Sequence, residues 1–252
     1  MDFQNSPTKT QPTISVSLAH GTHSGVLENL GQRIAGEDVT SGQILTVAEL
    51  ETEYQVSRTV IREAVRVLES AGMIVSKRRV GLTIQPYDRW DSFDTRVIRW
   101  VLNGPRRHTL LESLTELRFA VEPVAARLAA MRAPASTAPR LVEAATNLIE
   151  LAKRRLGHSK EFLEVDVEFH SVLINSSQNP LFASLSDPIC ETLKGRTALG
   201  LTPAEPDPSA ISNHLKTALA ILNKDPKSAE KCARGYVVQI WDEVADSAVH
   251  NS

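Results

Sequence analysis

Hydrophobic residues recur at every third or fourth position along most of the chain, a spacing that predicts amphipathic helices. Near the N-terminus it predicts three short helices, over residues 26–34, 47–55 and 58–71. Thr46 and Glu49 have the spacing of a capping box, so the second helix is expected to begin after Thr46. Ser57 is the expected cap of the third helix, and Gly72 is its expected end.

Two short apolar runs, 73–76 and 82–84, come after the third helix and predict a β-hairpin. The turn between them is basic and contains Lys77, Arg78, Arg79 and Gly81. Three helices followed by such a hairpin form a winged helix-turn-helix, whose third helix enters the major groove of DNA. The N-terminal residues of that helix, which lie nearest the bases, are Ser57, Arg58, Thr59 and Arg62.

The second half of the chain has only helical periodicity, which predicts an antiparallel helical bundle. Its expected helices, separated by Pro, Gly, Asp or Asn, cover residues 108–132, 137–156, 159–176, 180–199, 209–223 and 226–248. The predicted fold is therefore mainly α, with one small β-hairpin. We expect a disordered tail over 1–20, the winged helix over 21–86, a linker with a linking helix over 87–107, and a helical effector-binding and dimerisation domain over 108–250.

Composition agrees with a folded protein of two domains, because 42% of the 252 residues are hydrophobic and 23% are charged. Two cysteines are too few for a disulfide framework and fit a reducing compartment. The sequence has no signal peptide and no apolar run long enough to cross a membrane. We therefore expect a cytoplasmic protein without a membrane partner.

The net charge of −2 does not by itself suggest a nucleic-acid partner, but the distribution of charge does. Between residues 58 and 79 there are six basic and two acidic residues, and the bases are absent from the second helix. A single exposed arginine is commonly only solvated, whereas this grouping at one helix end and one turn favours DNA contact. The expected DNA-binding residues are Ser57, Arg58, Thr59, Arg62, Arg66, Lys77, Arg78, Arg79 and Gly81.

A candidate polar site lies in the helical half. Asp166 and His170 are four residues apart on one helix face with apolar neighbours, and His214 lies within the apolar stripe of a later helix. These three residues could converge on a divalent metal. Spacing alone leaves a second interpretation open, in which Asp166 pairs with His170 at the surface and His214 is a hydrogen-bonded core residue.

Arg118 shares a helix face with apolar residues and is expected to point inward. Glu122 is its alternative partner, but an Arg-to-Glu pair four residues apart contributes only about 0.2 to 0.5 kcal/mol on a helix. We therefore expect Arg118 to bind the carboxylate of a small ligand.

The segment Val56-Ser57-Arg58-Thr59-Val60-Ile61-Arg62-Glu63-Ala64-Val65-Arg66-Val67-Leu68 resembles the signature helix of GntR-family transcription regulators. The helical half of the chain resembles the all-helical FCD effector domain of the FadR subfamily. The resemblance implies a homodimeric repressor on a palindromic operator, contacted by the signature helix and the wing around Val80 and Gly81. Ala48 departs from the family, because many relatives have a DNA-contacting arginine at this position in the second helix.

The same resemblance implies a metal in the effector domain. In metal-binding members an Asp-x-x-x-His pair and two later histidines hold the ion, and Asp166, His170 and His214 match the first three positions. Tyr236 falls on the fourth, so the site is expected to be more open. Zinc is the expected ion, with manganese or nickel as alternatives. Arg118, Arg196 and Tyr236 are the expected effector-binding residues.

The segment 90–102 resembles the subgroup that responds to sugar acids such as galactonate or gluconate. A 2-hydroxy carboxylate can chelate a metal while an arginine binds its charge, which suits sugar acids and also lactate. The predicted function is a repressor released by such an effector. Two alternatives are a repressor with a purely structural metal and a metal-dependent enzyme domain fused to a DNA anchor. The sequence has none of the common hydrolase or nucleotide-binding motifs, so no enzyme is expected.

Overall fold

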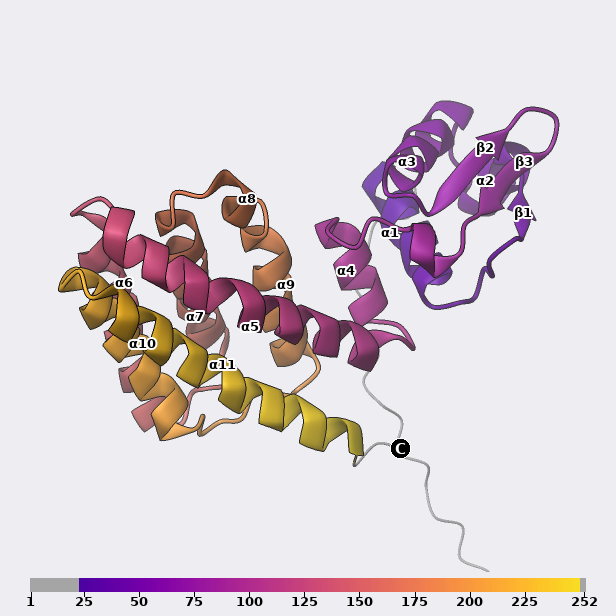
Figure 1. The fold of residues 1–252 in the computed structure, drawn as a ribbon. Helices are drawn as coiled ribbons and strands as arrows, with labels where there is room; N and C mark the ends of the chain where they lie inside the picture. The colour runs from indigo at the N-terminus through magenta and orange to yellow at the C-terminus, as the bar shows by residue number, and fades with distance from the viewer. Residues whose placement is uncertain (1–22, 250–252) are drawn as a thin grey trace, which may run out of the picture.

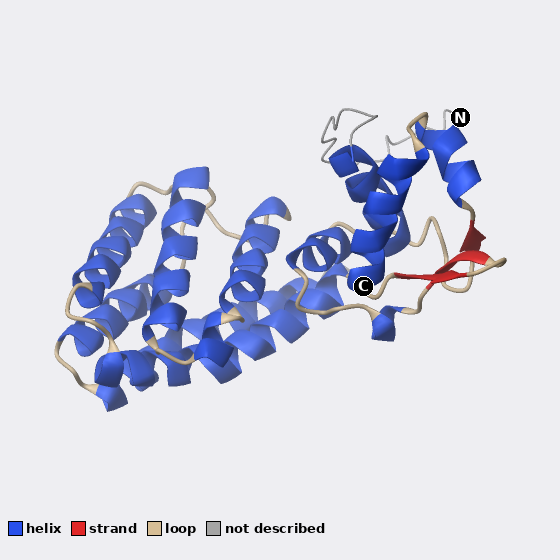
Figure 2. Ribbon diagram, turned by 90° about the horizontal axis from the view of Figure 1, so that it is seen from above, coloured by secondary structure: helices blue, strands red, loops and turns tan. Residues whose placement is uncertain are grey.

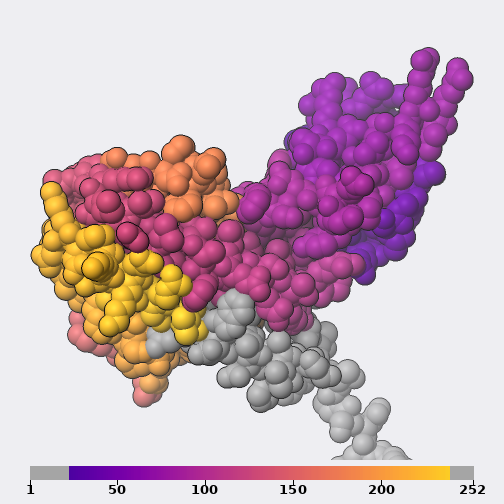
Figure 3. Space-filling view, in the orientation of Figure 1, coloured from indigo at the N-terminus to yellow at the C-terminus, as the bar shows by residue number. Residues whose placement is uncertain are grey.

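The computed structural model describes residues 23–249, with side chains described as far as residue 238. The expected tail over 1–20 lies outside the described residues. Figure 3 shows two lobes, an N-terminal lobe in indigo and purple and a C-terminal lobe running from magenta to yellow. The fold is mainly helical, as predicted, with a small antiparallel sheet in the first lobe.

The N-terminal lobe is a winged helix-turn-helix (Figure 1). Its elements are α1 (His23–Ala35), β1 (Ile44–Leu45), α2 (Val47–Tyr54), α3 (Arg58–Ser70), β2 (Ile74–Lys77) and β3 (Gly81–Ile84). The capping box is confirmed, because Thr46 Oγ1 accepts from the Glu49 amide and the Glu49 carboxylate accepts from the Thr46 amide. Ser57 occupies the N-cap position of α3, although its side chain forms no capping hydrogen bond.

The sheet has one strand more than the predicted hairpin. Its order is β1-β3-β2, with Ile44 opposite Thr83 on one side and Val75 opposite Thr83 on the other. β1 has only two residues, too few to show the alternation by which a strand is predicted. Figure 2 shows the three strands together at one edge of the lobe, with the β2–β3 turn at its end.

The linker contains a one-turn helix η1 (Tyr87–Arg89) and the helix α4 (Thr95–Leu102). Asp94 caps α4 by accepting from the amides of Arg96 and Val97. α4 packs against α1 on one side and against α5 and α9 on the other. One continuous hydrophobic cluster therefore includes α1, α3, the sheet, α4 and the start of α5.

The C-terminal lobe is a bundle of antiparallel helices. They are α5 (Arg107–Arg132), α6 (Thr137–Lys153), α7 (Lys160–Ser176), α8 (Pro180–Ala183), α9 (Ser186–Ala198), α10 (Pro208–Leu222) and α11 (Pro226–Val249). α5 lies between α11 and α7, at the centre of the bundle (Figure 1). None of the helices in the described part of the chain is long and apolar enough to span a bilayer.

The prediction of one helix over 180–199 was wrong, because the chain breaks there into α8 and α9. Pro188 explains the break. In a continuous helix its ring would clash with the carbonyl of Ser184, four residues earlier, and it has no amide to donate. Ser184 instead ends α8, and Pro188 lies in the first turn of α9, where a missing amide costs little.

Trp100 fixes α4 to the winged helix. Its side chain is 2% exposed, its Nε1 donates to Glu28 Oε2 at 2.7 Å, and its ring lies against Gly31 of α1. A Cβ atom at Gly31 would lie 2.6 Å from the indole ring, so only glycine permits this approach.

We therefore expect Gly31→Ala to destabilise the protein by about 1 to 3 kcal/mol, because an added methyl overpacks this contact. Thermal and urea unfolding would measure the loss. In the double variant with Trp100→Leu, the free-energy cost of the methyl should be much smaller than in the wild-type background. Additive effects of the two substitutions would show that the indole contact does not determine the residue at position 31.

Candidate functional site

The first candidate site is the exposed surface formed by α3 and the wing. Ser57, Arg58, Thr59 and Arg62 are all exposed at the N-terminal half of α3, on the side opposite its buried residues. Arg58 and Arg62 make no ion pair among the described residues, so their guanidinium groups are free to donate to bases or phosphates. Arg66 is exposed as well, but it pairs with Glu63 at 2.7 Å.

The wing presents Lys77, Arg78 and Arg79 on the exposed turn between β2 and β3 (Figure 1). The Val80 amide donates to the Lys77 carbonyl at 3.1 Å, and Arg79 has a φ of 65°. Gly81 has a φ of 125°, and a Cβ there would lie 2.7 Å from the Leu45 carbonyl oxygen. Gly81 thus shapes the base of the wing by allowing β1 to approach β3.

α2 contributes no positive charge to this surface. Ala48, the position at which the family resemblance implied an arginine, is exposed. Two of the helix's carboxylates are already engaged, Glu49 in the capping box and Glu53 with Arg33 at 2.7 Å. The cationic surface therefore consists of the start of α3 and the wing.

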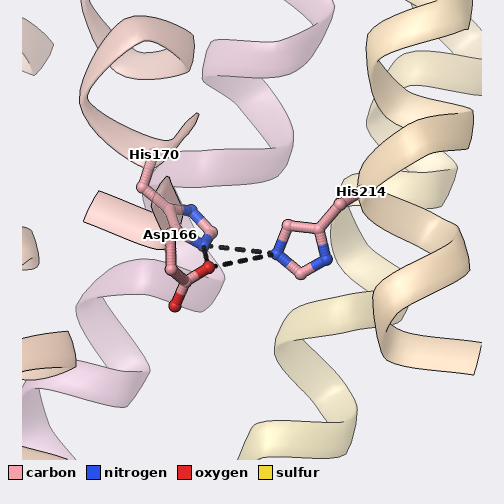
Figure 4. A group of neighbouring side chains, drawn as sticks. All are labelled: Asp166, His170 and His214. Carbon is pink, nitrogen blue, oxygen red and sulfur yellow. Dashed lines mark hydrogen bonds and ion pairs between the residues drawn. The ribbon is translucent and has the colours of Figure 1, made fainter. Parts of the chain in front are cut away.

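The second candidate site is a polar cluster inside the helical bundle. Asp166 and His170 project from α7 toward His214 of α10 (Figure 4). His170 Nε2 lies 3.4 Å from Asp166 Oδ1 and 3.4 Å from His214 Nε2, and His214 Nε2 lies 3.7 Å from Asp166 Oδ1. His170 and His214 are buried, whereas the Asp166 side chain is 18% exposed.

The far side of each imidazole ring fixes which nitrogen carries the proton. His214 Nδ1 lies 2.9 Å from the Ala210 carbonyl, which can only accept a hydrogen bond, so His214 Nε2 carries the lone pair. His170 Nδ1 lies 2.8 Å from the Glu122 carboxylate, so in the neutral ring the proton is favoured on Nδ1 and the lone pair on Nε2. Two lone pairs and a carboxylate oxygen therefore face one another.

Glu122, on α5, is the residue of this site that the sequence analysis underrated. Its side chain is fully buried, and Oε1 accepts from Arg118 Nε at 2.7 Å while Oε2 faces His170. Arg118 is also fully buried, and its second contact is with His170 Nε2 at 3.2 Å. The pairing considered too weak for a helix surface thus forms in the interior, where an unpaired charge would be far costlier.

Burial and neighbouring charges shift the pKa values of these groups. Burial and His170 together lower the pKa of His214 to about 4, so this ring is neutral at pH 7. Burial would raise the pKa of the Glu122 carboxyl, but Arg118 and His170 outweigh it and hold this pKa well below its usual range. Burial lowers the pKa of His170, but Glu122 and Asp166 raise it above its ordinary value, while Arg118 opposes them.

The ligand atoms of Asp166, His170 and His214 fit a divalent cation. A tetrahedral ion with ligands at about 2.0 to 2.1 Å separates those ligands by about 3.4 Å. The separations here are 3.4, 3.4 and 3.7 Å. Without a cation the facing lone pairs would repel, so the donor set and its spacing both suit zinc or a similar ion.

Tyr236 of α11 lies beside both imidazole rings of the cluster, and its hydroxyl has no hydrogen-bond partner among the described residues. Its ring is fully buried and stacks on His214, with 4.4 Å between centroids and 18° between planes. Burial and the nearby Glu122 raise the pKa of the phenol well above its ordinary value, so it stays neutral. Tyr236 therefore supports the His214 ring and leaves the fourth side of the cluster without a protein ligand.

A cavity of about 50 Å³ adjoins the cluster, lined by Asp166, His214 and Arg196 among others. Arg196, on α9, is buried and lines the same cavity as Asp166, so a second arginine borders the site. The opposite wall is formed by the segment after α9, including Thr202, Pro203 and Pro206. This volume has room for an ion with about one or two water-sized ligands.

A winged helix with an exposed basic face, joined to a helical bundle with a buried polar cluster, defines a DNA-binding protein with a second, helical domain. Models of two bacterial families match the chain, "Bacterial regulatory proteins, gntR family" over residues 22–84 and "FCD domain" over 113–239. The chain belongs to the GntR family of transcription regulators, FadR subfamily, and is a DNA-binding regulator, not an enzyme.

Similar proteins agree with this assignment. The galactonate operon transcriptional repressor of Escherichia coli K12 is 31% identical over 212 residues, which cover 82% of this chain and 90% of that protein. The transcriptional repressor NanR of Cronobacter sakazakii is 25% identical, over 86% of this chain and 82% of the relative. The solved structure of E. coli McbR/YncC has the same fold, with a TM-score of 0.51 and 16% identity over 90% of this chain and 98% of its own.

Because Glu122 neutralises two neighbours in the interior, Glu122→Ala should destabilise the protein by about 3 to 5 kcal/mol, leaving Arg118 buried without its counter-ion. Urea unfolding would measure this loss. Glu168→Ala is the matched control, since Glu168 pairs with Arg140 at 3.1 Å on the exposed surface, where such pairs contribute about 0 to 1 kcal/mol. Equal losses in the two variants would contradict the structural role of Glu122.

Proposed function

We propose that this regulator is a cytoplasmic homodimeric repressor that leaves a palindromic operator when a small 2-hydroxy carboxylate, a sugar acid such as galactonate or gluconate, enters the metal-containing pocket of its helical domain. The observation that carries this proposal is the cluster of Asp166, His170 and His214, contacted by Arg118, next to a cavity that Asp166, His214 and Arg196 line. The galactonate repressor of E. coli is a relative whose name specifies a sugar acid.

In the DNA-binding half, Arg58 and Arg62 discriminate between bases, and Lys77, Arg78 and Arg79 neutralise phosphates. The exposed, unpaired state of Arg58 and Arg62 supports this division. Arg66 acts after exchanging its exposed partner Glu63 for a phosphate, at little energetic cost. Ser57, Thr59 and Gly81 complete the surface at the ends of α3 and the wing.

In the helical half, charge balance favours an anionic effector. The charge of Glu122 is compensated by Arg118, and a histidine that binds a metal must be neutral, so a divalent cation in the pocket that Asp166 and Arg196 line would leave an excess of positive charge. A hydroxy carboxylate would offset part of this charge, and its hydroxyl and carboxylate oxygens could supply the metal ligands that Tyr236 does not. Asp166, His170 and His214 would hold the metal, which would polarise and orient the effector.

Entry of a sugar acid requires the pocket to widen, because a cavity of about 50 Å³ is too small for six carbons and their oxygens. The pocket would widen by movement of α9 and of the segment that follows it. Arg196 faces the pocket, and the preceding Gly195 lies directly against Leu102 of α4, since a Cβ at Gly195 would be 2.5 Å from Leu102 Cδ1. Displacement of α9 is thereby passed to α4 and, through Trp100, to the winged helix.

The DNA-binding assignment predicts separable effects of two arginines. Arg62→Ala should remove about 1 to 3 kcal/mol of preference for the operator over random duplex. Arg78→Ala should weaken binding to both duplexes alike and reduce the salt slope by about one. Fluorescence anisotropy with a selected operator at several salt concentrations measures both, with the exposed Arg140→Ala as control. Uniform weakening by Arg62→Ala would assign it to phosphate contact instead.

The effector assignment predicts that zinc and galactonate or gluconate together raise the melting temperature and release operator DNA. At one hundred times its Kd a ligand stabilises by about 2.7 kcal/mol. His214→Ala should lose both responses, whereas His158→Ala, at an exposed histidine, should retain them. Zinc stabilisation with no response to any sugar acid or lactate would favour the structural-metal alternative, and turnover of the acid would favour an enzyme.

A further inference from the structure

We infer that Arg118 and the divalent cation compete for the same lone pair on His170, so that metal binding frees the Arg118 guanidinium for an anionic ligand. This inference rests on the proposed metal-dependent effector site and adds an order of events to it. The observation behind it is the contact of 3.2 Å between Arg118 Nη2 and His170 Nε2, the atom that also faces Asp166 and His214.

An imidazole nitrogen has one in-plane lone pair, and a guanidinium group can only donate hydrogen bonds. With its proton on Nδ1, toward Glu122, His170 can offer the Nε2 lone pair either to Arg118 or to a metal. A metal bound at Nε2 would also repel the guanidinium across this short contact. In the arrangement observed, Arg118 therefore supplies the positive charge that the facing lone pairs require.

Arg118 can move away from His170 and keep its ion pair with Glu122. Its Nε donates to Glu122 Oε1 at 2.7 Å, and this ion pair can persist while a tilt of the rigid, planar guanidinium group moves Nη2 away from His170. Its Nη1 has no hydrogen-bond partner and is fully buried. A ligand carboxylate would satisfy Nη1 and the released Nη2 together, in the bidentate geometry that arginine prefers. Metal and anion would then promote each other's binding, with equal coupling in both directions.

Calorimetric titration of chelator-treated protein with zinc, with and without glycolate as the probe anion, tests the inference. Substitution of Arg118 or of Glu122 alone would leave the other charge buried without a counter-ion, so the informative comparison is the wild type with the double variant Arg118→Gln/Glu122→Gln. Circular dichroism verifies that each is folded. The double variant should bind zinc about tenfold more tightly than the wild type, because the charge-assisted hydrogen bond from Arg118 to His170 no longer competes.

Glycolate should tighten zinc binding by the wild type about tenfold and have no effect on zinc binding by the double variant. Arg127→Gln, at an exposed arginine of the same helix, should behave as the wild type. If the wild type binds zinc and the double variant binds it no more tightly, the competition between Arg118 and the metal is overturned. The metal site itself would stand. Zinc binding by none of the proteins would overturn the metal site, and the competition with it.

Discussion

The helical domain is organised around a carboxylate that has no contact with water. Glu122 lies fully buried on α5, and its two oxygens face Arg118 Nε at 2.7 Å and His170 Nδ1 at 2.8 Å. Because a buried charge must be paired, this one group keeps a guanidinium inside the bundle and turns the His170 ring so that Nε2 faces Asp166 and His214. The position of the polar cluster and the orientation of its donors both depend on this buried charge.

Local sequence signals predicted most of the fold, because they act within a few residues. The capping box of α2, the extent of α3 and the basic turn of the wing are all fixed by neighbours in the sequence. The third strand and the break between α8 and α9 were missed. β1 is a strand only through its pairing with β3, which is distant in the sequence. Whether Pro188 breaks a helix or is tolerated in a first turn depends on where α9 begins.

The three residues could be named as candidate ligands, since Asp166 and His170 share a helix face and His214 interrupts an apolar stripe, but only the family resemblance favoured a metal over a hydrogen-bonded core. Glu122 could not be judged in the same way. The worth of its pair with Arg118 depends on burial by α7, α10 and α11, which helix spacing does not reveal. A glutamate one turn after an inward-pointing arginine was the available signal. The loss of stability on breaking such an ion pair rises from about half a kcal/mol on a helix surface to about 3 to 5 kcal/mol in an interior.

The same dependence on packing decides how the two lobes can communicate. One hydrophobic cluster runs without interruption from α1 through Trp100 of α4 to Leu114 of α5, so the winged helix cannot swing on its linker without exposing that core. Under the proposed function, a displacement of α9 would press on Leu102 of α4 at Gly195 and, through the same cluster, on the winged helix. Two operator half-sites lie about 34 Å apart along DNA, and a small rotation at α4 becomes a larger shift at α3. A tightly packed junction therefore suits an allosteric repressor better than a flexible junction does. With a packed junction, the free energy of effector binding acts on the position of the DNA-reading helix, and little of it is dissipated in bending the linker.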